Sequence, residues 1–222
     1  MQNLIHYRKF SEVPDEKDWT ADEYEGIDGL FWLINDSGAW TGPLKNWRED
    51  SKDFMSQVKN FDVVICAGGN CGMYPRFYAN YFKKVYSWEP DPDNYKCLQM
   101  NCDSEQFELF NGAISNTTDK IYKLYNNNKK NVGTHRLQKD VKNANVEMYR
   151  IDDLNLEKID LIHLDIEGHE PMAIEGAKET IKKHHPVIIT EKAKGHHLLI
   201  ELGYKEFKKL TMDTIYIYEG NS

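Results

Sequence analysis

From residue 61 onward the sequence alternates between short apolar runs and segments with helical character, and this alternation constrains the fold more than any other feature. Residues 61–67 and 159–165 are dominated by apolar side chains, as is typical of strands buried on both faces. Strands that alternate with helices pack as a parallel sheet joined by right-handed crossovers. The sequence therefore predicts an α/β fold with a doubly wound, mostly parallel sheet.

Glycine, proline and polar clusters set the bounds of the other elements. Helices are expected over residues 75–84, 90–101, 171–184 and 196–202. Further strands are expected over residues 85–89, 106–110, 120–125, 186–191, 207–210 and 214–218. The last two strands are expected to form a C-terminal antiparallel hairpin at one edge of the sheet.

Residues 1–58 differ from the rest of the chain in their hydrophobic pattern, because they show no sustained strand or helix period. They hold four of the five tryptophans: Trp19, Trp32, Trp40 and Trp47. Disordered tails are poor in such aromatic residues. We therefore expect an ordered, Trp-rich N-terminal cap or extension over residues 1–58, folded onto a main domain over residues 59–222.

The composition excludes several classes of protein. The net charge of −8 argues against a general nucleic-acid binder. No apolar stretch approaches the roughly 20 residues of a membrane span, and the N-terminus lacks a secretory signal, so we expect a cytoplasmic protein. Basic residues predominate over 120–150, which is either a solvated loop or a docking surface for an anionic substrate. A homo-oligomer is left open.

A glycine-rich turn follows the first predicted strand. It contains Gly68, Gly69 and Gly72, and Glu89 ends the next strand about 20 residues on. This spacing suits a carboxylate that accepts hydrogen bonds from the ribose of an adenosine. The turn lacks both the Lys-Ser/Thr of a phosphate loop and the Gly-x-Gly-x-x-Gly of a dinucleotide site. An adenosine ligand without a pyrophosphate fits better, and S-adenosylmethionine is the obvious one.

A second cluster follows the strand over residues 159–165. Five ionisable groups stand within residues 163–170: His163, Asp165, Glu167, His169 and Glu170. Strand alternation is expected to place His163 and Asp165 on one face, with Glu167 at the strand's tip. Buried ionisable groups are costly unless they are partnered or functional. The cluster therefore predicts a functional site.

Four stretches, over residues 64–72, 88–94, 111–115 and 160–170, resemble the FkbM-type S-adenosylmethionine-dependent methyltransferases. Gly176-Ala177 and residues 186–191 extend the resemblance. It implies a class I, Rossmann-like methyltransferase fold with S-adenosylmethionine as cofactor. The family usually has Asp where this chain has Cys66, and Lys where it has His163. The second difference is expected to make the site more responsive to pH.

The resemblance also implies roles for individual residues. Cofactor contacts are expected from Gly68, Gly69, Asn70, Gly72, Glu89, Asn111, Gly112, Ala113 and Asp165. Catalytic roles are expected for Asp165, Glu167 and His169, with Glu167 or His169 as the base. Contacts with the acceptor are expected from His135 and Glu191.

Together these features predict an O-methyltransferase that acts on a hydroxyl of a sugar or other small hydroxylated metabolite. No metal ligand is assigned, but a variant stays open in which Asp165, Glu167 and Glu191 hold a hard cation. Two other readings also stay open: a nicotinamide-dependent oxidoreductase, and a non-catalytic adenosine-cofactor binder or assembly protein.

Overall fold

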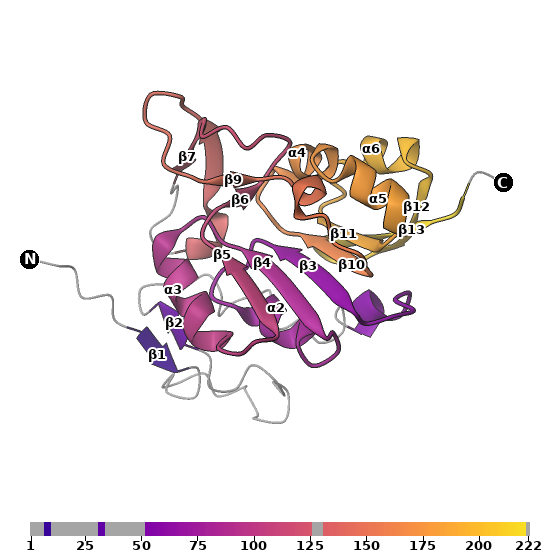
Figure 1. The fold of residues 1–222 in the computed structure, drawn as a ribbon, viewed down its shortest axis with the longest axis horizontal. Coiled ribbons are helices and arrows are strands. Elements are labelled where there is room, and N and C mark those ends of the chain that lie inside the picture. The colour runs from indigo at the N-terminus through magenta and orange to yellow at the C-terminus, as the bar shows by residue number, and fades with distance from the viewer. Residues whose placement is uncertain (1–6, 10–30, 34–51, 126–130, 221–222) are drawn as a thin grey trace, which may run out of the picture.

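A computed structural model describes residues 7–9, 31–33, 52–125 and 131–220. Its centre is a seven-stranded sheet with the order β12-β13-β11-β10-β3-β4-β5 (Figure 1). The strands are β3 (Val63–Ala67), β4 (Lys84–Trp88), β5 (Phe107–Phe110), β10 (Leu161–Leu164), β11 (Val187–Glu191), β12 (Tyr204–Lys209) and β13 (Asp213–Tyr218). Only β13 runs against the others. The predicted doubly wound sheet with a terminal antiparallel hairpin is confirmed.

Helices cover both faces of this sheet. The helices α2 (Met73–Tyr78) and α3 (Pro92–Asn101) lie on one face, and α4 (Glu170–Glu175), α5 (Lys178–His184) and α6 (His196–Glu201) lie on the other (Figure 1). Strand alternation divides the core accordingly. Val64 and Cys66 belong to the cluster on the α2 side, whereas Ile65 and Ala67 belong to the cluster that includes α4 and α5. Strand β3 is therefore apolar on both faces, as its continuous apolar run predicts.

The prediction of a single helix over residues 171–184 is wrong, because this stretch forms two helices, α4 and α5. The break falls at Gly176, where an added Cβ would lie 1.9 Å from the carbonyl oxygen of Ser115. The Gly176 carbonyl also accepts a hydrogen bond from the Asp152 backbone N–H at 2.9 Å. The chain at Gly176 is thus fixed by distant backbone, and the helical path does not continue through it.

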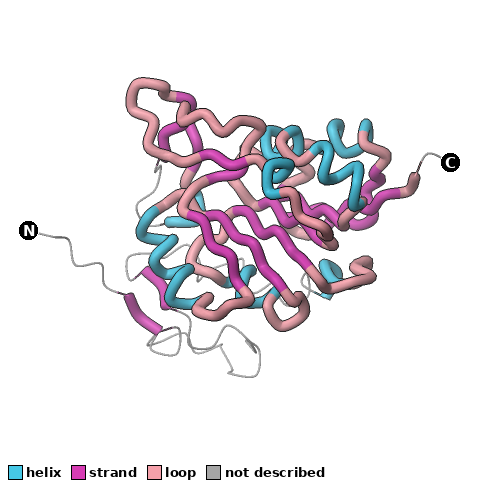
Figure 2. The backbone as a smooth tube through the Cα atoms, in the orientation of Figure 1, coloured by secondary structure: helices cyan, strands magenta, loops and turns pink. Residues whose placement is uncertain are grey.

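Two of the three small strand pairs described beyond the main sheet follow β5 in the chain, and the sequence predicted only one of their strands. Strand β6 (Ala113–Ile114) pairs with β9 (Met148–Tyr149), and β7 (Tyr122–Tyr125) pairs with β8 (Arg136–Lys139). Short helical turns precede β8, at η3 (Val132–Thr134), and follow β9, at η4 (Ile151–Leu154). Figure 2 shows how much of this region is loop. A small apolar cluster, including Ala113, Val146 and Met148, joins the two pairs.

Parts of the N-terminal segment pack on the main domain. Strand β1 (Tyr7–Lys9) pairs with β2 (Phe31–Leu33), and the Asn101 side chain accepts from the Phe31 N–H and donates to its carbonyl, both at 2.7 Å. Phe54 is fully buried in the cluster on the α2 side, together with Val58. Trp19, Trp40 and Trp47 lie outside the described residues. The role of residues 1–58 as a cap stays a prediction.

Truncation of Phe54 is expected to test this packing. Phe54→Ala should lower the free energy of unfolding by about 3–5 kcal/mol, because a fully buried ring is lost and a void remains. Urea denaturation measures the change. Phe207→Ala is the matched control, since Phe207 is 40% exposed and should change stability little. Equal stabilities for the two variants would show that this part of the segment is not part of the core.

Two further features concern the chain as a whole. The cysteines Cys66, Cys71, Cys97 and Cys102 are all buried and free, as expected of structural thiols. Within the described ranges, no helix combines the length and the apolar character needed to cross a bilayer.

Candidate functional site

The loops that follow β3, β4, β10 and β11 meet at one edge of the sheet, where the strand order reverses between β3 and β10 (Figure 1). Four non-glycine residues in these loops adopt positive φ: Asn70 (46°), Glu167 (54°), Lys192 (50°) and Ala193 (56°). This conformation is strained for L-residues and concentrates where the surrounding structure has a functional use for it. This edge is therefore the candidate functional site, which we describe as two half-sites.

The first, the Glu89 half-site, consists of the β3 turn (residues 68–72), Glu89, Asp91, Asn94 and residues 111–113. Glu89 is only 5% exposed. One carboxylate oxygen accepts from the Asn70 N–H and the other from the Asp91 N–H, both at 2.8 Å. Burial raises the pKa of Glu89 to about 7, although these hydrogen bonds oppose the shift. Glu89 is therefore a buried acceptor whose charge changes near neutral pH.

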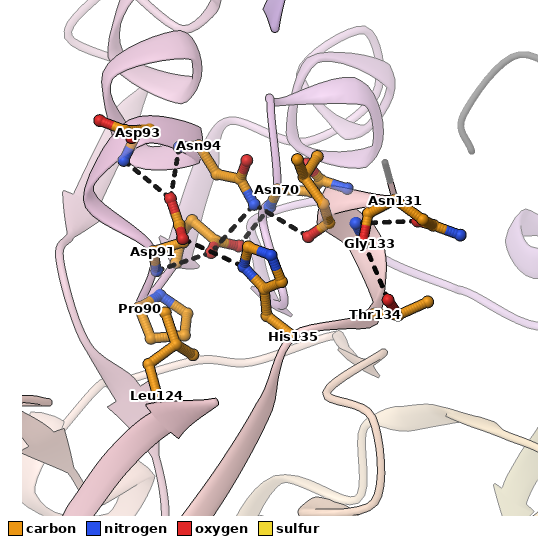
Figure 3. Close-up of polar contacts among 12 residues, drawn as sticks. Asn70, Pro90, Asp91, Asp93, Asn94, Leu124, Asn131, Gly133, Thr134 and His135 are labelled. Carbon is orange, nitrogen blue, oxygen red and sulfur yellow. Dashed lines mark hydrogen bonds and ion pairs between the residues drawn. The ribbon is translucent and has the colours of Figure 1, made fainter. Parts of the chain in front are cut away.

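Buried polar atoms without partners surround this carboxylate. Among the described residues, Asn70 Oδ1, Asn94 Oδ1 and His135 Nε2 are buried and make no hydrogen bond. Figure 3 shows Asn70, Asn94 and His135 close together beside Asp91. Buried polar groups are nearly always hydrogen-bonded in native proteins. Unused donors and acceptors around a carboxylate fit a polar ligand such as the ribose of a nucleoside.

The glycines of this half-site are required by packing. An added Cβ at Gly68, which has φ of 85°, would lie 1.8 Å from the Asp165 carbonyl oxygen. At Gly69 it would lie 2.5 Å from Ser87 Oγ. After β5, Asn111 Nδ2 and the Gly112 N–H both donate to the Glu89 carbonyl, at 2.8 and 3.1 Å. The protein's own contacts thus bring these predicted residues together, and their contact with a cofactor stays a prediction.

The second, the Asp165 half-site, consists of Asp165, Glu167, Glu191, Asp213 and the neighbouring turns. One oxygen each of Asp165, Glu167 and Glu191 lies within 4.8 Å of the others, so the predicted acidic residues do converge. Burial raises the pKa of Asp165 well above its usual value, and the negative charges of Asp213 and Glu191 add to the effect. Lys192 and Lys194 both form ion pairs with Glu191, which is 4% exposed, and they lower its pKa against the effect of burial.

Sequence reasoning missed Asp213 as a site residue. It is 5% exposed and lies opposite Glu191 in the register of β11 and β13. The sequence placed Asp213 in a hairpin turn far from residues 163–170, and no local motif marks it. Only the antiparallel return of β13 brings this carboxylate to the same edge.

Glu170 holds the turn that carries Glu167. Its fully buried carboxylate accepts from the Ile166 N–H at 3.2 Å and from the Gly168 N–H at 2.9 Å. Lys194 Nζ lies 3.6 Å from the same carboxylate. The acidic motif therefore combines a partly buried carboxylate at Glu167 with a fully buried, supporting carboxylate at Glu170.

His169 does not belong to the converging group of Asp165, Glu167 and Glu191. Its Nε2 lies 3.0 Å from Ser115 Oγ, and its ring contacts the edge of Tyr122 at a centroid distance of 4.9 Å. Burial lowers the pKa of His169 to about 4, so the imidazole is neutral at physiological pH. Of the two predicted bases, Glu167 is the one that shares a site with Asp165 and Glu191.

The expected pH response at His163 is wrong. His163 is fully buried among the rings of Phe54, Tyr74 and Tyr78, and its Nδ1 lies 2.7 Å from the Tyr78 hydroxyl. Burial lowers the pKa of His163 to about 3, so this side chain does not titrate near neutrality. Strand alternation carries it into the apolar core on the α2 side, away from solvent.

The burial of His163 is instead expected to make the stability of the fold sensitive to acid. Its pKa is about 3 when folded and about 6.5 when unfolded, so its stabilising contribution is lost as the pH falls from 6.5 towards 3. His163→Asn is expected to be less stable at pH 7 but to lose less stability over this range. Urea denaturation at several pH values measures the difference. His197→Asn, at an exposed position, should keep the wild-type slope.

The strand order, with the reversed β13 between β11 and β12, defines a class I, Rossmann-like methyltransferase fold. Residues 68–210 match the methyltransferase FkbM domain, and the chain belongs to this family. A search of curated proteins found no match.

Among the solved structures that align with this chain are the following three. Methyltransferase FkbM from Methylobacillus flagellatus KT aligns with a TM-score of 0.47 and 18% identity over 72% of this chain; the chain spans 44% of that protein. The precorrin-8w decarboxylase from Methanobacterium thermoautotrophicum aligns with a TM-score of 0.47 and 14% identity, over 77% of this chain and 90% of that one. A Streptococcus mutans protein in complex with SAH aligns with a TM-score of 0.42 and 13% identity, over 77% and 96%.

Proposed function

We propose that this protein is an S-adenosylmethionine-dependent O-methyltransferase that acts on a hydroxyl of a sugar or other small hydroxylated acceptor. The observation that carries the proposal is the direct junction of the two half-sites. The Asp165 N–H donates to the Ala67 carbonyl at 3.1 Å, and only a glycine fits at residue 68 beside the Asp165 carbonyl. A site that suits a nucleoside therefore abuts a site that suits hydroxyl groups.

The Glu89 half-site would hold the cofactor, which supplies an electrophilic methyl group when it is bound. The Glu89 carboxylate would accept hydrogen bonds from the ribose hydroxyls, next to the unpartnered Oδ1 atoms of Asn70 and Asn94. The methionine portion would lie along Gly68, Gly69, Asn70 and Gly72, and the adenine along Asn111, Gly112 and Ala113.

The Asp165 half-site would bind and activate the acceptor. Burial, together with the negative charge of Glu191, raises the pKa of Glu167, which favours its role as the base that removes the hydroxyl proton. Asp165 would orient the reacting groups, and Glu191 and His169 would contact the acceptor. Arg136 and Lys192 have side chains 59% and 55% exposed beside these carboxylates, which suits an acceptor with an anionic substituent.

A turnover assay tests the proposal. The protein is incubated with methyl-labelled S-adenosylmethionine and a panel of monosaccharides, sugar phosphates and small polyols, and the label in each acceptor is measured. Methylation of a hydroxyl is the expected result. Membership of the FkbM family favours this outcome over the nicotinamide-dependent reading. Binding of S-adenosylhomocysteine (SAH), the demethylated cofactor, without turnover on any acceptor would favour the non-catalytic binder.

A metal-assisted version of this reaction is also testable, because the oxygens of Asp165, Glu167 and Glu191 converge. Lys192 and Lys194 already neutralise Glu191, so we expect turnover to survive EDTA. Loss of turnover in EDTA and its recovery with Mg²⁺ or Mn²⁺ would instead assign the three carboxylates to a cation.

A further inference from the structure

Residues 131–136, which we call the strap, cross the site from one half-site to the other. The strap begins at Asn131, whose side chain accepts from the Gly133 N–H at 3.1 Å and shapes η3. Asn94 Nδ2 donates to the Val132 carbonyl at 3.2 Å, which ties the strap to the start of α3. Figure 3 shows Asn131, Gly133 and His135 beside Asn70 and Asn94. The strap therefore lies against the residues that surround Glu89.

Two adjacent strap residues reach different half-sites. His135 Nδ1 lies 3.0 Å from Asp91 Oδ2, and Arg136 lies 3.6 Å from Glu167 Oε2. The backbone at His135 is extended (φ −68°, ψ 137°), and neighbouring side chains of an extended chain point in opposite directions. One short segment thus contacts the Glu89 half-site on one side and the turn that carries Glu167 on the other.

His135 acts on Glu89 through Asp91. The Asp91 N–H donates to Glu89 Oε1 at 2.8 Å, and Asp91 Oδ1 caps α3 by accepting from the N–H groups of Asp93 and Asn94. The second Asp91 oxygen is the one beside His135. The His135 side chain is 6% exposed, and neither of its ring nitrogens makes a hydrogen bond among the described residues, although Nδ1 lies within ion-pair distance of Asp91. A buried imidazole with unused hydrogen-bonding capacity is placed to respond to a ligand at Glu89.

We propose that the strap couples the two half-sites, with His135 and Arg136 as positioning residues. A nucleoside ligand at Glu89 contacts the same residues that hold the strap, so its binding fixes the strap. The fixed strap then holds Arg136 against Glu167 and orders the turn over residues 165–170. By reciprocity, an occupied acceptor side strengthens cofactor binding. This inference rests on the proposed function, because it takes the Glu89 half-site to be the cofactor side.

Amide exchange with SAH as the probe tests the coupling. The Gly168 N–H reports on the Glu167 turn, since it donates to Glu170. Saturating SAH is expected to slow exchange of this amide about fivefold or more in the wild-type protein. His135→Ala should weaken SAH binding and abolish the slowing, and His135→Asn, which keeps a donor near the Nδ1 position, should restore both. Arg136→Met should weaken SAH binding less than His135→Ala but should abolish the slowing. Lys139→Met, which removes an exposed charge from the same strand, should behave as wild type.

The outcomes separate this inference from the proposed function. If the wild-type protein binds SAH but the exchange of Gly168 does not change, the coupling is refuted and the cofactor site stands. If Arg136→Met retains the full slowing, the coupling through the strap is likewise refuted. If the wild-type protein does not bind SAH at all, the proposed function fails, and the inference fails with it.

Discussion

Replacement of Glu167 by Gln is expected to slow methyl transfer roughly 10²–10⁴-fold in single-turnover experiments, which is the contribution typical of a positioned general base. Gln keeps the size of the side chain and some hydrogen bonding but cannot take the hydroxyl proton. The affinity for SAH should fall no further than in Arg136→Met, because both substitutions affect the same ion pair and Glu167 lies on the acceptor side. The measurement uses the best acceptor found in the panel and labelled S-adenosylmethionine.

Glu179→Gln provides the matched control for this prediction. Glu179 lies in α5, its side chain is 74% exposed, and it pairs with Lys182 on the surface. The Glu179→Gln variant should therefore retain wild-type turnover. A Glu167→Gln enzyme with an unchanged chemical step would show that the acidic motif supports the turn and that the base is elsewhere.

Replacement of Glu89 by Gln is expected to weaken SAH binding by roughly 1.5–3 kcal/mol, which is about 10- to 150-fold. The substitution removes the negative charge that would strengthen the hydrogen bonds donated by the ribose hydroxyls of the cofactor. It also places the amide nitrogen, a donor, against either the Asn70 or the Asp91 N–H, which needs an acceptor. Isothermal titration calorimetry measures the change. Glu108→Gln, at an exposed position on β5, should bind SAH as wild type.

The pH dependence of binding provides an independent check on Glu89. Since burial raises its pKa to about 7, the ionised acceptor is depleted below neutral pH. Wild-type affinity for SAH should therefore fall as the pH drops below 7, by up to about tenfold per pH unit. The Glu89→Gln variant should lose this dependence. A flat profile in the wild-type protein would mean that the charge on Glu89 does not contribute to binding.

The main strands of the central sheet, its doubly wound arrangement and the terminal hairpin could be predicted from the sequence, because apolar runs and turn residues are local signals. The glycine turn, Glu89 and the cluster over residues 163–170 were also visible, since each directly follows an apolar run. In a parallel sheet such residues must gather at one edge. Strand order and contact distances were not needed for that conclusion.

Strand alternation alone could not decide which side chains share a site. It placed His163 and Asp165 on one face, but the rings of Phe54, Tyr74 and Tyr78 enclose His163 in the core, where its charged form is too costly. The sequence also predicted one helix over residues 171–184, whereas the chain forms α4 and α5 on either side of Gly176, which lies close against the backbone of Ser115. Both results depend on residues distant in the sequence.

The fold class and the stretches of chain that hold the predicted site residues follow from local sequence, because period, composition and turn chemistry are properties of neighbouring residues. The pairing of Asp213 with Glu191, the contact of His135 with Asp91 and the contact of Arg136 with Glu167 arise only in the folded chain. These contacts join residues from separate elements. Their geometry is set by how strands pair and how loops pack across the edge of the sheet, which no local pattern encodes.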